Sequence, residues 1–101
     1  MRICIYGAGA IGGYLGCMLS KTGAEISLIA RGPHLKAMQD HGLRLVMDRN
    51  ETVHQLNCTD QPETLAPQDY VIVTLKAHSV PKIVPQIKKL LAPDGAVVTA
   101  V

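Results

Sequence analysis

The sequence predicts an α/β fold in which a mostly parallel sheet carries helices on both faces. Short apolar runs alternate with segments whose apolar residues recur at helical spacing, the pattern of strand–helix–strand units. Several of these runs are apolar nearly throughout, which is typical of parallel strands covered on both faces. One pair of extended runs, residues 43–47 and 52–58, is separated only by a polar turn and predicts an antiparallel hairpin inserted into the parallel pattern. At 101 residues the chain is one domain at most.

The remaining elements follow from local signals. Asp60 is expected to cap a short helix with Glu63 reaching back, and Ser79 to cap the last helix, which Pro85 should bend. The β-branched run at residues 70–75 is expected to lie in the interior of the sheet. Strands are predicted at residues 3–6, 25–30, 43–47, 52–58, 70–75 and 96–101, and helices at residues 10–22, 33–41 and 80–91.

A glycine-rich turn joins the first strand to the first helix. Gly7 lets the chain turn sharply off the strand, Gly9 leaves room for a pyrophosphate to approach the backbone, and Gly12 lets the helix pack closely. The free N–H groups of the first helical turn, with the positive end of the helix dipole, would face that pyrophosphate. The strand–turn–helix context therefore predicts a Rossmann-like dinucleotide site whose loop comprises Gly7, Ala8, Gly9, Ala10, Ile11 and Gly12.

The end of the second strand indicates which dinucleotide is bound. A site for NAD usually has Asp or Glu there, bonded to the ribose 2′-hydroxyl, whereas this chain has Ala30 followed by Arg31. A guanidinium can hold a 2′-phosphate with two hydrogen bonds, and a carboxylate would repel it. Arg31 therefore favours NADP(H), the alternative being that it is a solvated loop residue.

Lys76 follows the strand at residues 70–75, on the edge of the sheet where ligands of open α/β folds collect. We expect it to contact cofactor or substrate, although a solvated lysine is the alternative. His78 lies nearby and is more readily interpreted as an exposed loop residue. The histidines have neither metal-ligand spacing nor neighbouring carboxylates or cysteines, so no metal site is predicted.

Composition narrows the class of protein. The net charge of +2 is spread along the chain, which is too little for a nucleic-acid surface. No run of about 18 apolar residues predicts a membrane span, and no leader directs secretion. Cys4 and Cys17 lie in apolar-periodic segments and are expected to be buried thiols, and Cys58 forms no paired motif with them. An odd, unpaired count fits the reducing cytoplasm.

Taken together, these features resemble the N-terminal part of the ketopantoate reductase (2-dehydropantoate 2-reductase) family. The resemblance covers the whole chain and rests on the glycine loop through Gly13, on Ile29-Ala30-Arg31-Gly32 with His34-Leu35, on Gly42-Leu43 and on Val73-Thr74-Leu75-Lys76-Ala77. It implies an NADPH-dependent enzyme that reduces the ketone of 2-oxopantoate, a branched 2-oxo acid, to pantoate in pantothenate biosynthesis. The family's phosphate loop then corresponds to residues 7–12, its 2′-phosphate arginine to Arg31 and its cofactor-side lysine to Lys76.

Family members continue past the position of Val101 into an Asn-Gly element and a helical domain with the catalytic lysine and a substrate-binding glutamate. Residues 1–101 are therefore expected to be a truncated dinucleotide-binding domain with no catalytic residue of its own, and inactive alone. Two alternatives stay open: a relative that reduces another 2-oxo or carbonyl substrate, and a non-catalytic dinucleotide sensor. Homodimerisation also stays open.

Overall fold

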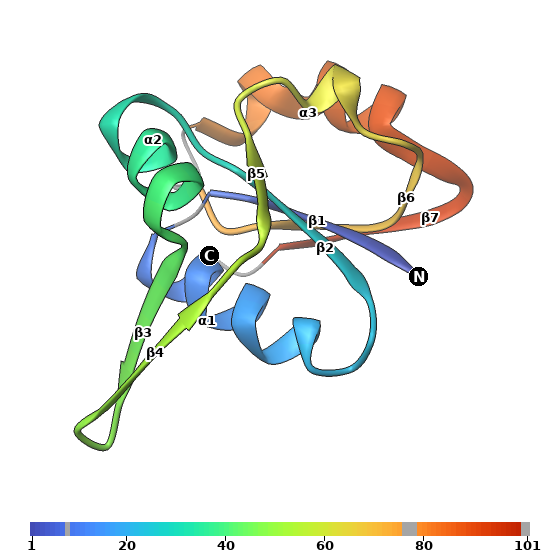
Figure 1. Cartoon of the computed structure of the whole chain (residues 1–101). Helices are drawn as coiled ribbons and strands as arrows, with labels where there is room; N and C mark the ends of the chain where they lie inside the picture. The colour runs from blue at the N-terminus through green and yellow to red at the C-terminus, as the bar shows by residue number, and fades with distance from the viewer. Residues whose placement is uncertain (8, 76–78, 100–101) are drawn as a thin grey trace.

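The computed structural model describes residues 1–7, 9–75 and 79–99, and within them a parallel sheet forms the centre of the molecule (Figure 1). Its strand order is β5-β2-β1-β6-β7, and every neighbouring pair is parallel. A separate antiparallel pair, β3-β4, forms the predicted hairpin. The strands are β1 (Arg2–Tyr6), β2 (Glu25–Ile29), β3 (Leu43–Met47), β4 (Asn50–His54), β5 (Asn57–Thr59), β6 (Gln68–Val73) and β7 (Leu91–Thr99); the helices are α1 (Ala10–Ser20), α2 (Gly32–His41), the 3-10 turn η1 (Pro62–Thr64) and α3 (Val80–Leu90).

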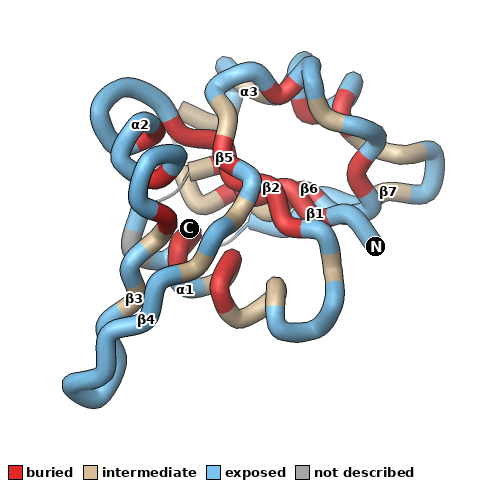
Figure 2. The backbone as a smooth tube through the Cα atoms, in the orientation of Figure 1, coloured by how far each residue is buried: buried red, intermediate tan, exposed pale blue. Residues whose placement is uncertain are grey.

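Helices cover both faces of the sheet, as predicted. Alternate residues of β1 point to opposite faces: Ile3 and Ile5 belong to one core cluster, and Cys4 and Tyr6 belong to the other. The first cluster includes residues of α1 and α2, and the second includes residues of α3. Figure 2 shows the buried segments gathered in the middle strands, while the hairpin extends outward and is mostly exposed.

The predicted single strand at residues 52–58 was wrong, because this stretch forms two strands in two sheets. β4 pairs with β3 in the hairpin, and β5 pairs with β2 in the parallel sheet, with Leu28 opposite Cys58. Leu56, between them, packs against the first core cluster. Alternation of apolar and polar residues indicates an extended backbone but does not indicate the partner strand, so the sequence pattern does not separate β4 from β5. The hairpin turn itself is tight, with positive φ angles at Asp48 and Arg49.

Three smaller expectations also need correction. Gln61, not Asp60, precedes η1, and neither Gln61 nor Ser79 makes a side-chain capping bond to the helix that it precedes. α3 includes Pro85 in its interior, and the bend expected there stays a prediction. β7 begins at Leu91 rather than at residue 96, and its pairing with β6 is interrupted between Leu91 and Ala96. β6 lies between β1 and β7, which confirms its interior position.

Candidate functional site

The parallel strands bring their carboxyl ends to one edge of the sheet, and the backbone joins them there. The Gly7 N–H donates to the carbonyl oxygen of Ile29 at 3.1 Å, and the Ala30 N–H donates to that of Thr59 at 3.1 Å. On the other side of β1, the Thr74 N–H donates to the carbonyl oxygen of Tyr6 at 2.9 Å. The loops that follow β1, β2, β5 and β6 are therefore held side by side at the edge where open α/β sheets bind ligands.

These loops surround a cavity of about 640 Å³, a volume suited to a nucleotide-sized ligand. It brings together Gly7, Gly9 and Arg31, which the sequence predicted as cofactor contacts. Its lining residues come from the ends of β1 and β2, from the loops, from α2 and η1, and from one side of α3: Tyr6, Gly7, Gly9, Ile29, Ala30, Arg31, His34, Asp60, Pro62, Leu75, Ser79, Lys82, Ile83 and Gln86.

Two glycines of the loop are needed by the protein itself. Gly7 has a φ of +102°, which side chains rarely adopt, and a Cβ there would lie 2.7 Å from Thr74 Oγ1. A Cβ on Gly12 would lie 1.9 Å from the Gly7 carbonyl oxygen, so the first turn of α1 can pack against the loop only with glycine at this position. The predicted turn at Gly7 and close approach at Gly12 are both present.

Gly9 differs from both. Its φ of −73° suits any residue, and a Cβ there would meet no atom of the described residues within 4 Å. The fold therefore gives no steric reason for glycine at this exposed position at the N-terminus of α1. In any α-helix the N–H groups of the first turn have no intrahelical partner, and here they start at the edge of the cavity that Gly9 lines. An absent side chain beside free N–H groups fits an approaching phosphate.

Thr74 holds the glycine loop and was not predicted as a site residue. Its hydroxyl lies 2.9 Å from the carbonyl oxygen of Tyr6 and 2.7 Å from that of Gly7, within donating distance of both. The Gly7 carbonyl oxygen is thereby held toward Thr74, which follows β6. The sequence signal was the position of Thr74 at the end of a strand, but its partner strand could not be read from the sequence.

Arg31 lies at the N-terminus of α2, exposed and lining the cavity beside His34. Among the described residues, no carboxylate lies within 4.0 Å of its guanidinium, since the ion pairs found there join Arg2 to Glu25 and Arg44 to Glu51. Asp60, expected only as a helix cap, follows β5 and lines the same cavity. The guanidinium is thus available to an anionic ligand.

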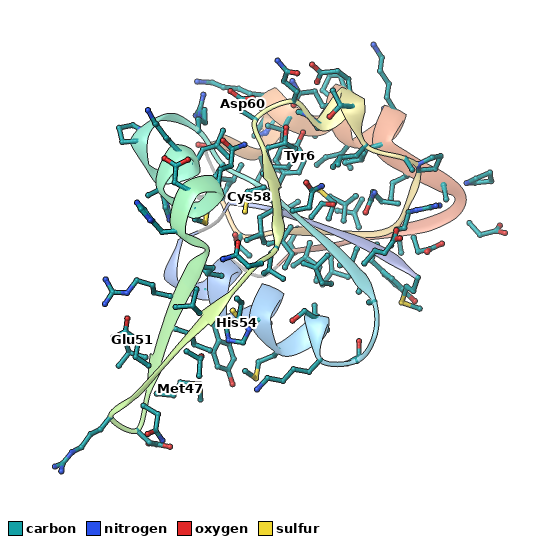
Figure 3. All side chains as sticks on the ribbon, in the orientation of Figure 1. Tyr6, Met47, Glu51, His54, Cys58 and Asp60 are labelled. Atoms are coloured by element: carbon teal, nitrogen blue, oxygen red, sulfur yellow. The ribbon has the colours of Figure 1, made fainter. Side chains whose placement is uncertain are left out.

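Tyr6 and Gln86 join the loop side of the cavity to α3. The Tyr6 hydroxyl donates to Gln86 Oε1 at 2.7 Å, although the residues lie 80 positions apart in sequence. Burial, chiefly, raises the pKa of Tyr6 to about 12, with Cys4 and Glu63 adding to the shift, so the phenol keeps its proton. In Figure 3, Tyr6 lies on the side of the sheet toward α3, and Asp60 lies at the end of β5.

The other predicted residues are placed less fully. Ala8, Lys76 and His78 lie outside the described residues. Ala10 begins α1, and Ile11, 59% exposed, does not line the cavity. Within residues 1–7, 9–75 and 79–99, no group of three or more His, Cys, Asp or Glu side chains could hold a metal ion. No helix in that part of the chain is long and apolar enough to cross a membrane.

Comparison with known proteins identifies the family. The sequence model described as "Ketopantoate reductase PanE/ApbA" matches residues 3–101, nearly the whole chain. The chain belongs to the ketopantoate reductase family. This confirms the resemblance carried by the glycine loop, by Arg31 and by the residues that follow β6.

Relatives within and beside the family agree with this assignment. The 2-dehydropantoate 2-reductase of Mesorhizobium japonicum is 46% identical over 98% of this chain. A PanE/ApbA family ketopantoate reductase structure from Ralstonia eutropha superposes with a TM-score of 0.85, at 32% identity and 96% coverage. A D-mandelate dehydrogenase structure with NADH and anilino(oxo)acetate gives 0.87, at 32% identity and 98% coverage. The chain spans only 31%, 33% and 32% of these proteins, respectively.

Proposed function

We propose that this chain is the NADP(H)-binding part of a 2-dehydropantoate 2-reductase-like oxidoreductase, which reduces 2-oxopantoate to pantoate for pantothenate biosynthesis in the cytoplasm. The observation that carries the proposal is that one cavity is lined both by the helix N-terminus at Gly9, which carries no side chain, and by Arg31, whose guanidinium pairs with no carboxylate of the described residues. A phosphate group is expected at each of these positions in NADP(H), and NAD(H) has none at the second.

Each part of the cavity has a task in this proposal. The pyrophosphate would accept hydrogen bonds from the N–H groups of the first turn of α1, and Thr74 would keep the loop in the conformation that exposes them. Arg31 would hold the 2′-phosphate through a charge-assisted pair of bonds. Lys76 is proposed to lie near the nicotinamide ribose and the substrate. The cofactor, when bound, supplies the hydride.

In this proposal the chain binds the cofactor, and the general acid and the substrate contacts come from a further part of the enzyme. Reducing a ketone requires a proton for the developing alkoxide, so a general acid must stand beside the substrate. We place that acid and the substrate contacts in the remaining length of the relatives, since the chain matches 31% of the Mesorhizobium japonicum protein. The chain alone is expected to bind NADPH without turning over a 2-oxo acid.

A second candidate is a reductase for a different 2-oxo acid that uses NADH. The D-mandelate dehydrogenase structure supports it, because that protein holds NADH and is as similar in fold as the ketopantoate reductases. Asp60 is compatible with this candidate, since it gives the cavity a carboxylate that could accept a hydrogen bond from a ribose hydroxyl.

Titration of this chain with NADPH and with NADH, followed by the fluorescence of the reduced nicotinamide, separates the two candidates. We expect NADPH to bind at least tenfold more tightly, and equal affinities would favour the NADH enzyme. The substrate is tested with a chimeric enzyme, in which this chain replaces the matching 31% of the Mesorhizobium japonicum relative. Oxidation of NADPH with 2-oxopantoate, and not with the 2-oxo acid of mandelate, is the expected result; the reverse would overturn the substrate assignment.

A further inference from the structure

The side of the cavity formed by α3 is not explained by phosphate binding. Ser79, Lys82, Ile83 and Gln86 recur at i, i+3, i+4 and i+7, so one stripe of the helix and its N-terminal flank faces the cavity. Arg31, and His34 on α2, line the same cavity. The cavity therefore has a wall that the proposed phosphate contacts leave unused.

Gln86 is the oriented polar group of that wall. Its Oε1 accepts the hydrogen bond from Tyr6, whose side chain is only 3% exposed and packs in the core cluster beneath α3. A carboxamide fixed through its oxygen presents its two N–H donors on the opposite side of the group. Among the described residues, the Gln86 amide nitrogen makes no hydrogen bond to the protein, so these donors are available to a ligand.

The rest of this region combines apolar surface with an acceptor. Ile83, Pro62 and Ala30 line the cavity and offer surface to a flat ring. Asp60, at the end of β5, adds a carboxylate, which accepts hydrogen bonds and cannot donate them when ionised. One donor and one acceptor beside an apolar surface match the edge of adenine, where the 6-amino group donates and the adjacent ring nitrogen accepts.

Covalent geometry connects this wall to the proposed cofactor. In NADP(H) the adenine is attached to C1′ of the ribose whose C2′ carries the extra phosphate, so the base must lie close to whatever holds that phosphate. Arg31 and Gln86 line the same cavity. We propose that Gln86, positioned by Tyr6, donates a hydrogen bond to a ring nitrogen of the adenine while Asp60 accepts one from its 6-amino group. This inference rests on the proposed binding of NADP(H).

The hypoxanthine analogue of NADPH tests the pair, because it replaces the 6-amino group with an oxygen, puts a proton on the adjacent ring nitrogen N1 and keeps every phosphate. That oxygen would face the Asp60 carboxylate and the N1–H would face the Gln86 donors, so the wild-type chain should prefer NADPH over the analogue by about tenfold, the scale of a lost hydrogen bond at a site whose two polar side chains are exposed without the ligand. The Gln86→Leu and Asp60→Asn variants should each reduce that preference several-fold. Gln55→Leu, at an exposed position between β4 and β5, is the matched control and should retain it.

A double-mutant cycle tests the role of Tyr6. Tyr6→Phe keeps the ring in the core and removes the hydroxyl, so it should reduce the preference in the wild type and change nothing further in Gln86→Leu. Equal losses in both backgrounds would show that Tyr6 acts only through stability. A wild-type chain that binds NADPH and its analogue equally would overturn the inference and leave the proposed function standing. Failure to bind NADPH at all would overturn both.

Discussion

The position of Gly9 permits a sharp separation of binding from folding. Since a Cβ there would meet nothing within 4 Å in the part of the chain that the structure describes, and the φ is −73°, Gly9→Ala should fold normally. Reduced freedom of the unfolded chain favours alanine by about 0.4–1 kcal/mol, while alanine is the poorer residue before a helix by a similar amount. The free energy of unfolding should therefore stay within about 1 kcal/mol of the wild-type value.

Binding should change far more. The added methyl group would occupy the space through which a phosphate reaches the N–H groups of α1, so at least one charge-assisted hydrogen bond would be lost. Such a bond contributes about 1.5–3 kcal/mol, which corresponds to a loss of about 10- to 100-fold in affinity for NADPH. Gly9→Val, which adds more bulk at the same place, should weaken binding further.

Gly12→Ala provides the opposite case. Its Cβ would stand 1.9 Å from the Gly7 carbonyl oxygen and 3.0 Å from Thr74 Oγ1, so the loop or the helix must move. Overpacking of this kind costs about 1–3 kcal/mol or more, and this variant should lose stability as well as affinity.

Urea unfolding followed by circular dichroism gives the stability of each variant, and titration with NADPH gives its affinity. The reasoning is refuted if Gly9→Ala remains folded and binds NADPH as tightly as the wild type, because the pyrophosphate would then lie elsewhere. It is equally refuted if Gly9→Ala unfolds, since the structure shows nothing for the methyl group to strike.

Three further variants test other parts of the site and core. Arg31→Ala should weaken NADPH binding by about 1.5–3 kcal/mol and leave the affinity for NADH nearly unchanged. Arg49→Ala in the hairpin turn is the control. Equal losses of affinity for both cofactors would contradict the assignment of Arg31 to the 2′-phosphate. Thr74→Val should cost about 1–2 kcal/mol of stability in urea unfolding and weaken NADPH binding, because the one hydroxyl proton that the carbonyl oxygens of Tyr6 and Gly7 share would be lost. Unchanged values would show that the glycine loop keeps its conformation without Thr74. Burial raises the pKa of the Cys4 thiol from 9.0 to about 12, so the unfolded chain loses this proton at a lower pH than the folded chain. The free energy of unfolding should therefore fall above about pH 9, by up to about 1.4 kcal/mol per pH unit. Cys4→Ala should flatten this slope in thermal unfolding, and an unchanged slope would assign it to other groups such as Tyr6.

The parts of the site that could be predicted from the sequence are those set by short-range geometry. Gly7 and Gly12 act within one strand–turn–helix unit, so their spacing alone specifies the sharp turn and the close contact. Arg31 could be placed because it follows the next strand of the same parallel unit. Each of these inferences needed only the connection between neighbouring elements, which is right-handed almost without exception.

Thr74 and Gln86 required the order of strands, which the sequence does not give. Thr74 contacts the glycine loop because β6 pairs with β1. Thr74 and Gly7, which this pairing brings together, lie 67 residues apart in the sequence. Gln86 meets Tyr6 because α3 packs on the same face of β1. The sequence does not place Asp60 in the site for a related reason. A single hairpin strand over residues 52–58 leaves no parallel strand that ends next to Asp60, whereas in the structure β5 joins the parallel sheet and ends at Thr59.

Asp60 and Ser79 reveal a general ambiguity at this edge of a parallel sheet. Both were expected to cap helices, yet both line the cavity, and Ser79 makes no side-chain capping bond to α3. In a strand–helix–strand fold, helix N-termini and strand carboxyl ends lie at the same edge, so a polar residue between them can serve the helix or a ligand. A capping bond contributes only about 1 kcal/mol, which a bond to a charged ligand can exceed. A side chain that faces the cavity without capping its helix is therefore better interpreted as a ligand contact, and this reasoning applies with most force to Asp60, which does not even occupy the capping position.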